Sequence, residues 1–191
     1  MLSTFLARYD TLALRPPPTP DTPADRRTWS ALQQDVQRRV MAWCRRGGGD
    51  GVVPLLQPWG RPWIEQPFAV AELTRSLGAD TDAVVQDLAL QLDGTWTMLA
   101  AGGRWAQRLL RLRVKWAECL WWRRRAGDAP WDCGYLDDRP DALSALARFK
   151  PRRPTLVITQ GLSSFSLQQA VQALTERQRS FRHPVRLLVV A

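Results

Sequence analysis

Residues 155–190 have the sequence TLVITQGLSSFSLQQAVQALTERQRSFRHPVRLLVV, and this stretch decides the fold class. Its two ends, 155–159 and 185–190, are short apolar runs rich in β-branched residues, a pattern typical of strands buried on both faces. The segment 167–181 between them is predicted to be an amphipathic helix, with Ser166 as its cap. Two apolar strands joined through a helix predict parallel neighbours with a right-handed crossover. The predicted fold class is therefore α/β, with a mixed α+β arrangement as the alternative.

The loop between the first strand and the helix is the predicted ligand-contacting part of this unit. Ligands of parallel sheets gather beyond the carboxyl ends of the strands, against the N-terminus of the next helix. The residues that occupy this place are Gln160, Gly161, Ser163, Ser164 and Ser166. Their spacing resembles the metal-dependent adhesion motif of von Willebrand A-type domains, which opens with an aspartate. Gln160 stands there without the carboxylate that a divalent ion needs, so neither a metal nor another cofactor is expected.

The chain before this unit is predicted to be mainly helical. A helix capped by Thr28 is expected over 28–44, and a shorter one begins at Pro140 and ends before residue 151. Residues 1–14 are a further amphipathic helix candidate, which either packs back onto its own domain or docks on a partner. The predicted parts are an N-terminal helix with a proline-rich spacer, a helical part, and a β-α-β part packed on it: 1–25, 26–127 and 128–191.

The helical part contains a pattern of two helices and a strand. A short helix is predicted at 70–77 and a tight turn at Gly78. A second helix is predicted to end at residue 92 and to be capped by Asp80 or Thr81. Residues 95–99 then alternate like a strand. On this pattern, residues 68–102 resemble the winged-helix superfamily of helix-turn-helix proteins, which implies either a DNA-reading helix or a protein docking module.

The second helix of this resemblance has the wrong charge for reading DNA. Four polar residues are predicted on its exposed face: Asp80, Asp82, Gln86 and Asp87. Neither arginine nor lysine occurs between residues 78 and 94. A helix in the major groove faces two rows of phosphates, so an acidic face there is unfavourable. The pattern therefore supports the fold better than it supports base reading by this helix.

Residues 104–125, here called the Arg/Trp segment, concentrate arginine and tryptophan. The segment holds seven arginines and Lys115 against the single acid Glu118. Guanidinium groups beside indoles suit phosphate contact combined with base stacking. The predicted nucleic-acid-binding residues are Arg104, Arg108, Arg111, Arg113, Lys115, Trp116, Arg123, Arg124 and Arg125. Helix and strand patterns both fit the segment, and the longer run of matches favours the helix.

Two interpretations of the Arg/Trp segment stay open. It forms a surface for a polyanion or a protein partner, or its arginines pair internally with the aspartates of 128–141 and cover its tryptophans. Such cation–π contacts contribute about 0.5–2 kcal/mol each. The net charge of +9 favours the polyanion. The excess of 25 arginines over two lysines weakens that inference, because this skew is typical of GC-rich coding sequences.

The residues that enzymes commonly use do not form a catalytic pattern in this sequence. The three cysteines, Cys44, Cys119 and Cys133, are widely spaced, which predicts reduced thiols in the cytoplasm. Cys133 lacks a second histidine that could activate it, and His183 is expected in a loop. No signal peptide and no membrane span are predicted. The chain is thus expected to be cytoplasmic and not an enzyme.

Two classes of function remain from the sequence. The first is a non-catalytic protein that binds DNA or RNA through the Arg/Trp segment. The second is a non-catalytic adaptor or subunit of a larger intracellular complex, in which the winged-helix-like segment is a protein docking module. The expected partner is DNA or RNA, or else an acidic protein that matches the basic charge of the chain. The acidic helix favours the second class, whereas the charge density of the Arg/Trp segment favours the first.

Overall fold

A computed structural model describes residues 13–18, 30–46, 56–58, 67–74, 81–100, 105, 108, 109, 112 and 130–191. Its helices are α1 (Ala31–Arg46), α2 (Thr81–Leu92), α3 (Thr95–Ala100), α5 (Pro140–Leu146) and α6 (Ser164–Arg177). A short 3-10 helix, η4 (Gln178–Ser180), follows α6. Its strands are β1 (Leu56–Pro58), β2 (Phe68–Leu73), β3 (Asp132–Leu136), β4 (Thr155–Gln160) and β5 (Val185–Val190).

The described strands form one sheet in the order β1-β2-β5-β4-β3. Strands β2, β5, β4 and β3 are parallel, and β1 pairs antiparallel with β2 at the edge. Strand β5 lies between β2 and β4, and all six of its residues are buried. The predicted α/β fold is confirmed, as is the closing unit, because β4 and β5 are parallel neighbours joined through α6.

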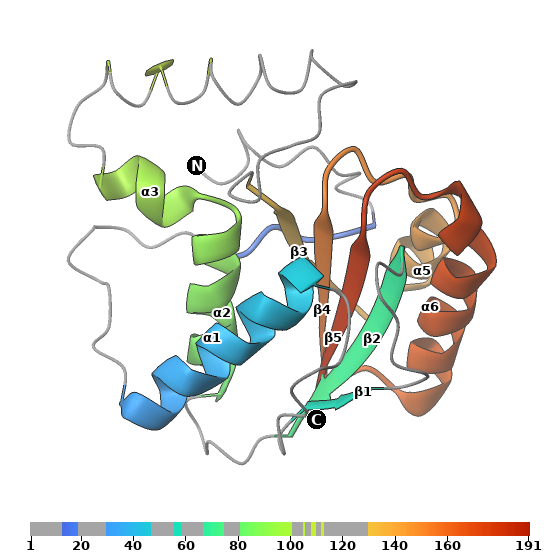
Figure 1. Cartoon of the computed structure of the whole chain (residues 1–191). Coiled ribbons are helices and arrows are strands. Elements are labelled where there is room, and N and C mark those ends of the chain that lie inside the picture. Colours follow the sequence, from blue (N-terminus) through green and yellow to red (C-terminus); the bar gives the residue numbers. More distant parts are fainter. Residues whose placement is uncertain are drawn as a thin grey trace.

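Helices cover this sheet on both sides (Figure 1). Helices α1 and α2 lie against one face, here called the α1 face, and α5 and α6 lie against the opposite α6 face. Side chains alternate along a strand, so β2, β3, β4 and β5 each contribute to both faces. In β5, Leu188 and Val190 join the cluster under α1, whereas Val185, Leu187 and Val189 join the cluster under α6.

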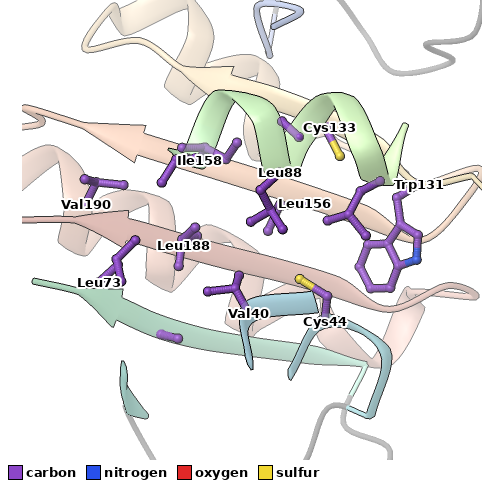
Figure 2. Packing of buried hydrophobic residues seen from close by; sticks show 14 of the residues in the cluster. Val40, Cys44, Leu73, Leu88, Trp131, Cys133, Leu156, Ile158, Leu188 and Val190 are labelled. Carbon is purple, nitrogen blue, oxygen red and sulfur yellow. The ribbon is translucent and has the colours of Figure 1, made fainter. Parts of the chain in front are cut away.

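The cluster on the α1 face is dense and contains two cysteines. Figure 2 shows Val40 and Cys44 of α1 and Leu88 of α2 directed at the side chains of the strands. Leu156 of β4 and Leu188 of β5 form the centre of that surface, and both are fully buried. Burying one such aliphatic side chain contributes about 1.5–3 kcal/mol, so this layer accounts for much of the attachment of α1 and α2.

Local capping explains where the helices begin. Before α1, the Gln33 N–H donates to Ser30 Oγ at 3.3 Å while the Ser30 N–H donates to Gln33 Oε1 at 2.8 Å, a reciprocal capping box. Helix α5 begins at Pro140, as predicted. Helix α6 begins three residues before the predicted start, because Ser163 Oγ accepts from the Ser166 N–H at 3.1 Å. The prediction of Ser166 as the cap was therefore wrong.

Two elements of the winged-helix pattern were predicted wrongly. The expected helix at 70–77 is strand β2, which runs along β5 and buries side chains on both faces. An apolar run of six residues fits either a helix or a strand. Here it forms a strand, because its backbone pairs with the edge of β5 that β4 leaves free. The expected strand at 95–99 is helix α3, whose Thr95 N–H donates to Asp93 Oδ1 at 2.7 Å. Capping by Asp93 overrides the β-propensity of the threonines and Trp96.

The segment 13–18 covers the free edge of β3. Arg15 and Tyr135 exchange two backbone hydrogen bonds of 2.8 Å in an antiparallel bridge. Leu14 is buried in the cluster of the α6 face, and the Pro18 carbonyl accepts from Gln86 Nε2 of α2 at 3.2 Å. Residues 13–18 thus pack back onto the domain. Residues 13 and 14, which were predicted to end a helix over 1–14, are not helical. Pairing of this kind protects an edge strand from other chains.

Several sequence predictions fall outside the described residues. These are the N-terminal helix over residues 1–12, the cap at Thr28, the turn at Gly78, the cap at Asp80, and Cys119. None of the helices in the described ranges combines the length and apolar character required to cross a bilayer.

Candidate functional site

The carboxyl ends of the parallel strands hold the predicted ligand loop. Gly161 follows β4 with a φ of 66°, a left-handed conformation that favours glycine, and the chain then enters α6. Gln160 Nε2 donates to Asp82 Oδ1 of α2 at 3.3 Å, and the Ser163 N–H donates to Asp138 Oδ2 at 3.4 Å. Contacts on both sides therefore fix the loop between the end of the sheet and α6.

The five predicted loop residues divide into two roles. Gln160, Ser163 and Ser166 take part in the contacts that hold the loop and cap α6, and Ser166 is itself buried. Gly161 and Ser164 line a cavity of about 320 Å³. Further lining residues, which sequence reasoning did not identify, come from β2, β4, β5 and α6: Glu72, Thr159, Val189 and Leu167.

The floor of this cavity is one row of three strand residues. Glu72 of β2 is the register partner of Val189 of β5, which is in turn the partner of Thr159 of β4. The sequence did contain one signal for this site, the carboxylate of Glu72 near the end of an otherwise apolar strand. The incorrect helix prediction at 70–77 placed Glu72 on a helix and hid that signal.

The described part of the Arg/Trp segment is an exposed helical surface. Trp105, Arg108, Leu109 and Leu112 are all helical, which agrees with the favoured pattern at these four positions. The guanidinium carbon of Arg108 lies 5.6 Å from the centre of the Trp105 ring. Trp105, Leu109 and Leu112 are 76%, 64% and 53% exposed. Three large apolar side chains at spacings of four and three thus lie on one side of a helix and face solvent.

The other predicted nucleic-acid-binding residues lie outside the described part of the chain: Arg104, Arg111, Arg113, Lys115, Trp116, Arg123, Arg124 and Arg125. Two of the aspartates that follow the segment, Asp132 and Asp137, have described ion-pair partners elsewhere. Asp132 lies 3.7 Å from Arg153, with both side chains buried, and Asp137 lies 3.2 Å from Arg139. The described ion pairs of these aspartates therefore join them to arginines outside 104–125.

Asp87 of α2 was predicted to be exposed, and the structure buries it. Its carboxylate accepts from Gln37 Nε2 of α1 at 2.7 Å and from Trp96 Nε1 of α3 at 2.8 Å. Gln91 Nε2 donates to the same carboxylate at 3.3 Å. The prediction was wrong because the packing of α1 and α3 against α2 encloses a position that the helical pattern alone places toward solvent. Asp82, by contrast, is exposed as predicted.

The buried cysteines lie in an environment that keeps their thiols protonated. Burial raises the pKa of Cys44 to about 12, and the nearby Arg186 and Arg45 only partly oppose this. Burial likewise raises the pKa of Cys133 well above 9, with Asp93 adding to the effect. A thiol must lose its proton to act as a nucleophile or metal ligand, so neither side chain suits such a role at neutral pH.

Among the described residues, no group of three or more histidine, cysteine, aspartate or glutamate side chains is arranged to hold a metal ion. Comparison of the chain with protein-family models, with curated proteins and with solved structures found no match in any of the three.

Proposed function

We propose that the protein associates with DNA or RNA, without catalysing a reaction, through the Arg/Trp segment. The observation that carries this proposal is the exposure of Trp105, which stays 76% exposed on a helical surface beside the exposed Arg108. The cation–π contact between the two side chains fits the internal interpretation equally well and is therefore no support by itself. Indole rings stack on bases, at about 1–3 kcal/mol per base, and guanidinium groups contact phosphates. The net charge of +9 supports the same class of partner.

Helix α2 has no part in this proposal. Its exposed Asp82 would face phosphate with the wrong charge, and the buried Asp87 serves the contacts among α1, α2 and α3. The β2 strand also replaces the first helix that a helix-turn-helix reader requires. Binding is therefore expected to depend on phosphate and stacking, with little preference for sequence.

The test is a titration of labelled single-stranded DNA, duplex DNA and RNA with the full chain at two salt concentrations. The variant R108Q/R111Q/R113Q/K115Q should lose about tenfold or more in affinity and show a shallower salt dependence, because each lost phosphate contact lowers the slope by about one. The matched control R148Q/K150Q/R179Q/R182Q removes the same charge from exposed residues of the α6 side and should change affinity far less. Absence of binding at low salt, or equal losses in the two variants, contradicts the proposal.

A second candidate function is supported by the two leucines of the same surface. Leu109 and Leu112 are more than half exposed, and aliphatic side chains make no useful contact with phosphate. An apolar stripe flanked by arginines suits the hydrophobic groove of an acidic protein, as an adaptor or subunit of a complex would require.

Two variants, L109E/L112E and W105A, separate the two candidate functions. L109E/L112E should abolish co-purification of a partner from nuclease-treated extract if the stripe docks on a protein, whereas W105A should weaken nucleic-acid binding by about fivefold or more. Retention of the partner by L109E/L112E after nuclease treatment excludes this docking surface.

A further inference from the structure

The cavity at the end of the sheet lies where the chain connections diverge. After β4 the chain passes directly into α6, on the α6 face, whereas the helix that follows β2 in the chain, α2, lies on the α1 face (Figure 1). Between the carboxyl ends of such strands, the loops separate and leave a crevice outside the sheet, which is where open α/β sheets bind ligands. The cavity occupies this place and is independent of the Arg/Trp segment.

The lining of this cavity, which is open to solvent on one side, has one carboxylate among largely apolar residues. Glu72 is the charged side chain among the lining residues. Leu162 and Leu167 form the wall on the side of α6, and Val189 forms the floor beside Glu72. A volume of about 320 Å³ is at the lower end of the range for small-molecule sites. It suits a short molecule with one polar end.

The carboxylate can accept a further donor. Glu72 already takes part in an interaction within the chain, and a carboxylate offers about four acceptor sites on its two oxygens. Thr159 is separated from Glu72 by Val189 and is buried, and its hydroxyl donates to the Leu188 carbonyl at 3.4 Å. Glu72 is thus the acceptor that a ligand can reach, and the group that complements a carboxylate is a donor with positive charge. The first turn of α6 at Ser164 also lines the cavity and favours negative charge, so an anionic probe is the competing ligand.

We propose that this cavity binds a small molecule that carries a protonated amine on a short apolar body. The amine donates to Glu72, and the apolar body lies against Leu162, Leu167 and Val189. The net charge of +9 repels a cationic ligand. Binding of the amine should therefore depend strongly on the local carboxylate of Glu72.

The test compares three probes with six carbon atoms each, hexylamine, 1-hexanol and hexanoate. Each is titrated into the full chain at neutral pH and followed by amide chemical shifts. Hexylamine should bind tightest and should shift the resonances of Gly161, Leu162 and Ser164. E72Q should weaken hexylamine about tenfold or more, the loss of a hydrogen bond to a charged group, and should leave 1-hexanol within about twofold. The matched control E176Q, an exposed carboxylate of α6, should change neither probe.

A further variant separates the apolar part of the site. L162A should weaken all three probes by a similar factor, because it removes part of the wall. If E72Q fails to fold, the ranking of the three probes on the unaltered chain still decides the matter. The proposal is overturned if hexanoate binds as tightly as hexylamine, if the shifts map elsewhere, or if folded E72Q binds hexylamine as well as the unaltered chain does.

Discussion

The two faces of the sheet are attached to their helices by different chemistry. On the α6 face, α5 and α6 meet the strands through aliphatic and aromatic side chains, and the polar groups lie at the ends, as Asp132 with Arg153 and as the cavity around Glu72. On the α1 face, Asp87 lies among α1, α2 and α3, and Cys44 and Arg186 are buried within the layer. The attachment of helices to the α6 face depends on buried apolar area and on packing. Their attachment to the α1 face depends also on directional hydrogen bonds.

This difference has a physical consequence for each face. Apolar packing tolerates small shifts, so the α6 face leaves room for a cavity at its end without exposing an unsatisfied group. A buried carboxylate loses much more when a donor moves away, because the low dielectric makes an unmet polar group costly. The relative positions of α1, α2 and α3 should therefore be more strictly defined than those of α5 and α6.

The largest effect is expected from Leu174→Ala on the α6 face. Leu174 is fully buried in α6, and truncating such a leucine leaves a cavity that costs about 2–5 kcal/mol. Denaturant unfolding measures this loss. The same substitution at Leu32, which is 57% exposed on α1, should cost about 0.5 kcal/mol or less. If the two variants lose equal stability, the burial of Leu174 contributes little to the attachment of α6 to the sheet.

The next effect is a pH dependence of the free energy of unfolding, which originates at Asp93 beside the α1 face. Burial raises the pKa of Asp93 from 3.8 to about 6, although hydrogen bonds from Thr95 oppose the shift. The stabilising contribution of Asp93 is therefore fully present below pH 3.8 and is lost as the pH rises through 6, on the order of 2–3 kcal/mol in all. Asp93→Asn keeps an acceptor for the Thr95 N–H and removes this titration.

The stability of Asp93→Asn relative to the unaltered chain should thus increase between pH 4 and 7, as measured by urea unfolding at several pH values. Asp141→Asn, at an exposed position of α5, provides the control and should not produce this trend. A constant difference across the range would mean that the Asp93 carboxyl titrates as it does in the unfolded chain.

A smaller effect is expected from Asp87→Ala. The change leaves the buried Gln37 amide without its acceptor, at a cost of about 1–3 kcal/mol, whereas the half-buried Gln91 and Trp96 can turn their donors to water. Glu176→Ala, at an exposed position of α6, should cost about 0.5 kcal/mol or less. Nearly equal losses would show that the bonds of Asp87 contribute little to the attachment of α1 and α3.

The closing unit was predictable because its local signals agree with its tertiary surroundings. Strands β4 and β5 are uniformly apolar, and a strand buried on both faces requires that composition. Only the start of α6 was misplaced, because several serines in a row can cap a helix and the backbone geometry selects Ser163. The predicted loop also adjoins the cavity, since the carboxyl end of a parallel strand has a fixed place in the sheet.

The part before it was less predictable for the opposite reason. The sequence FAVAEL of β2 suits a helix or a strand, and its pairing with β5, more than a hundred residues later, makes the choice. Glu72 became part of a candidate site, and Asp87 became buried, only through contacts with distant elements.

The sequence by itself thus determined the fold class, the parallel closing unit and the basic character of the protein, because these depend on composition and short-range periodicity. The tertiary structure alone decided that residues 68–73 form a strand and that Asp87 is a buried acceptor. It also decided that Glu72, Val189 and Thr159 form one row beneath a cavity. The physical reason is that sheet register and helix contacts join residues far apart in the chain, and no local pattern records which partner they will meet.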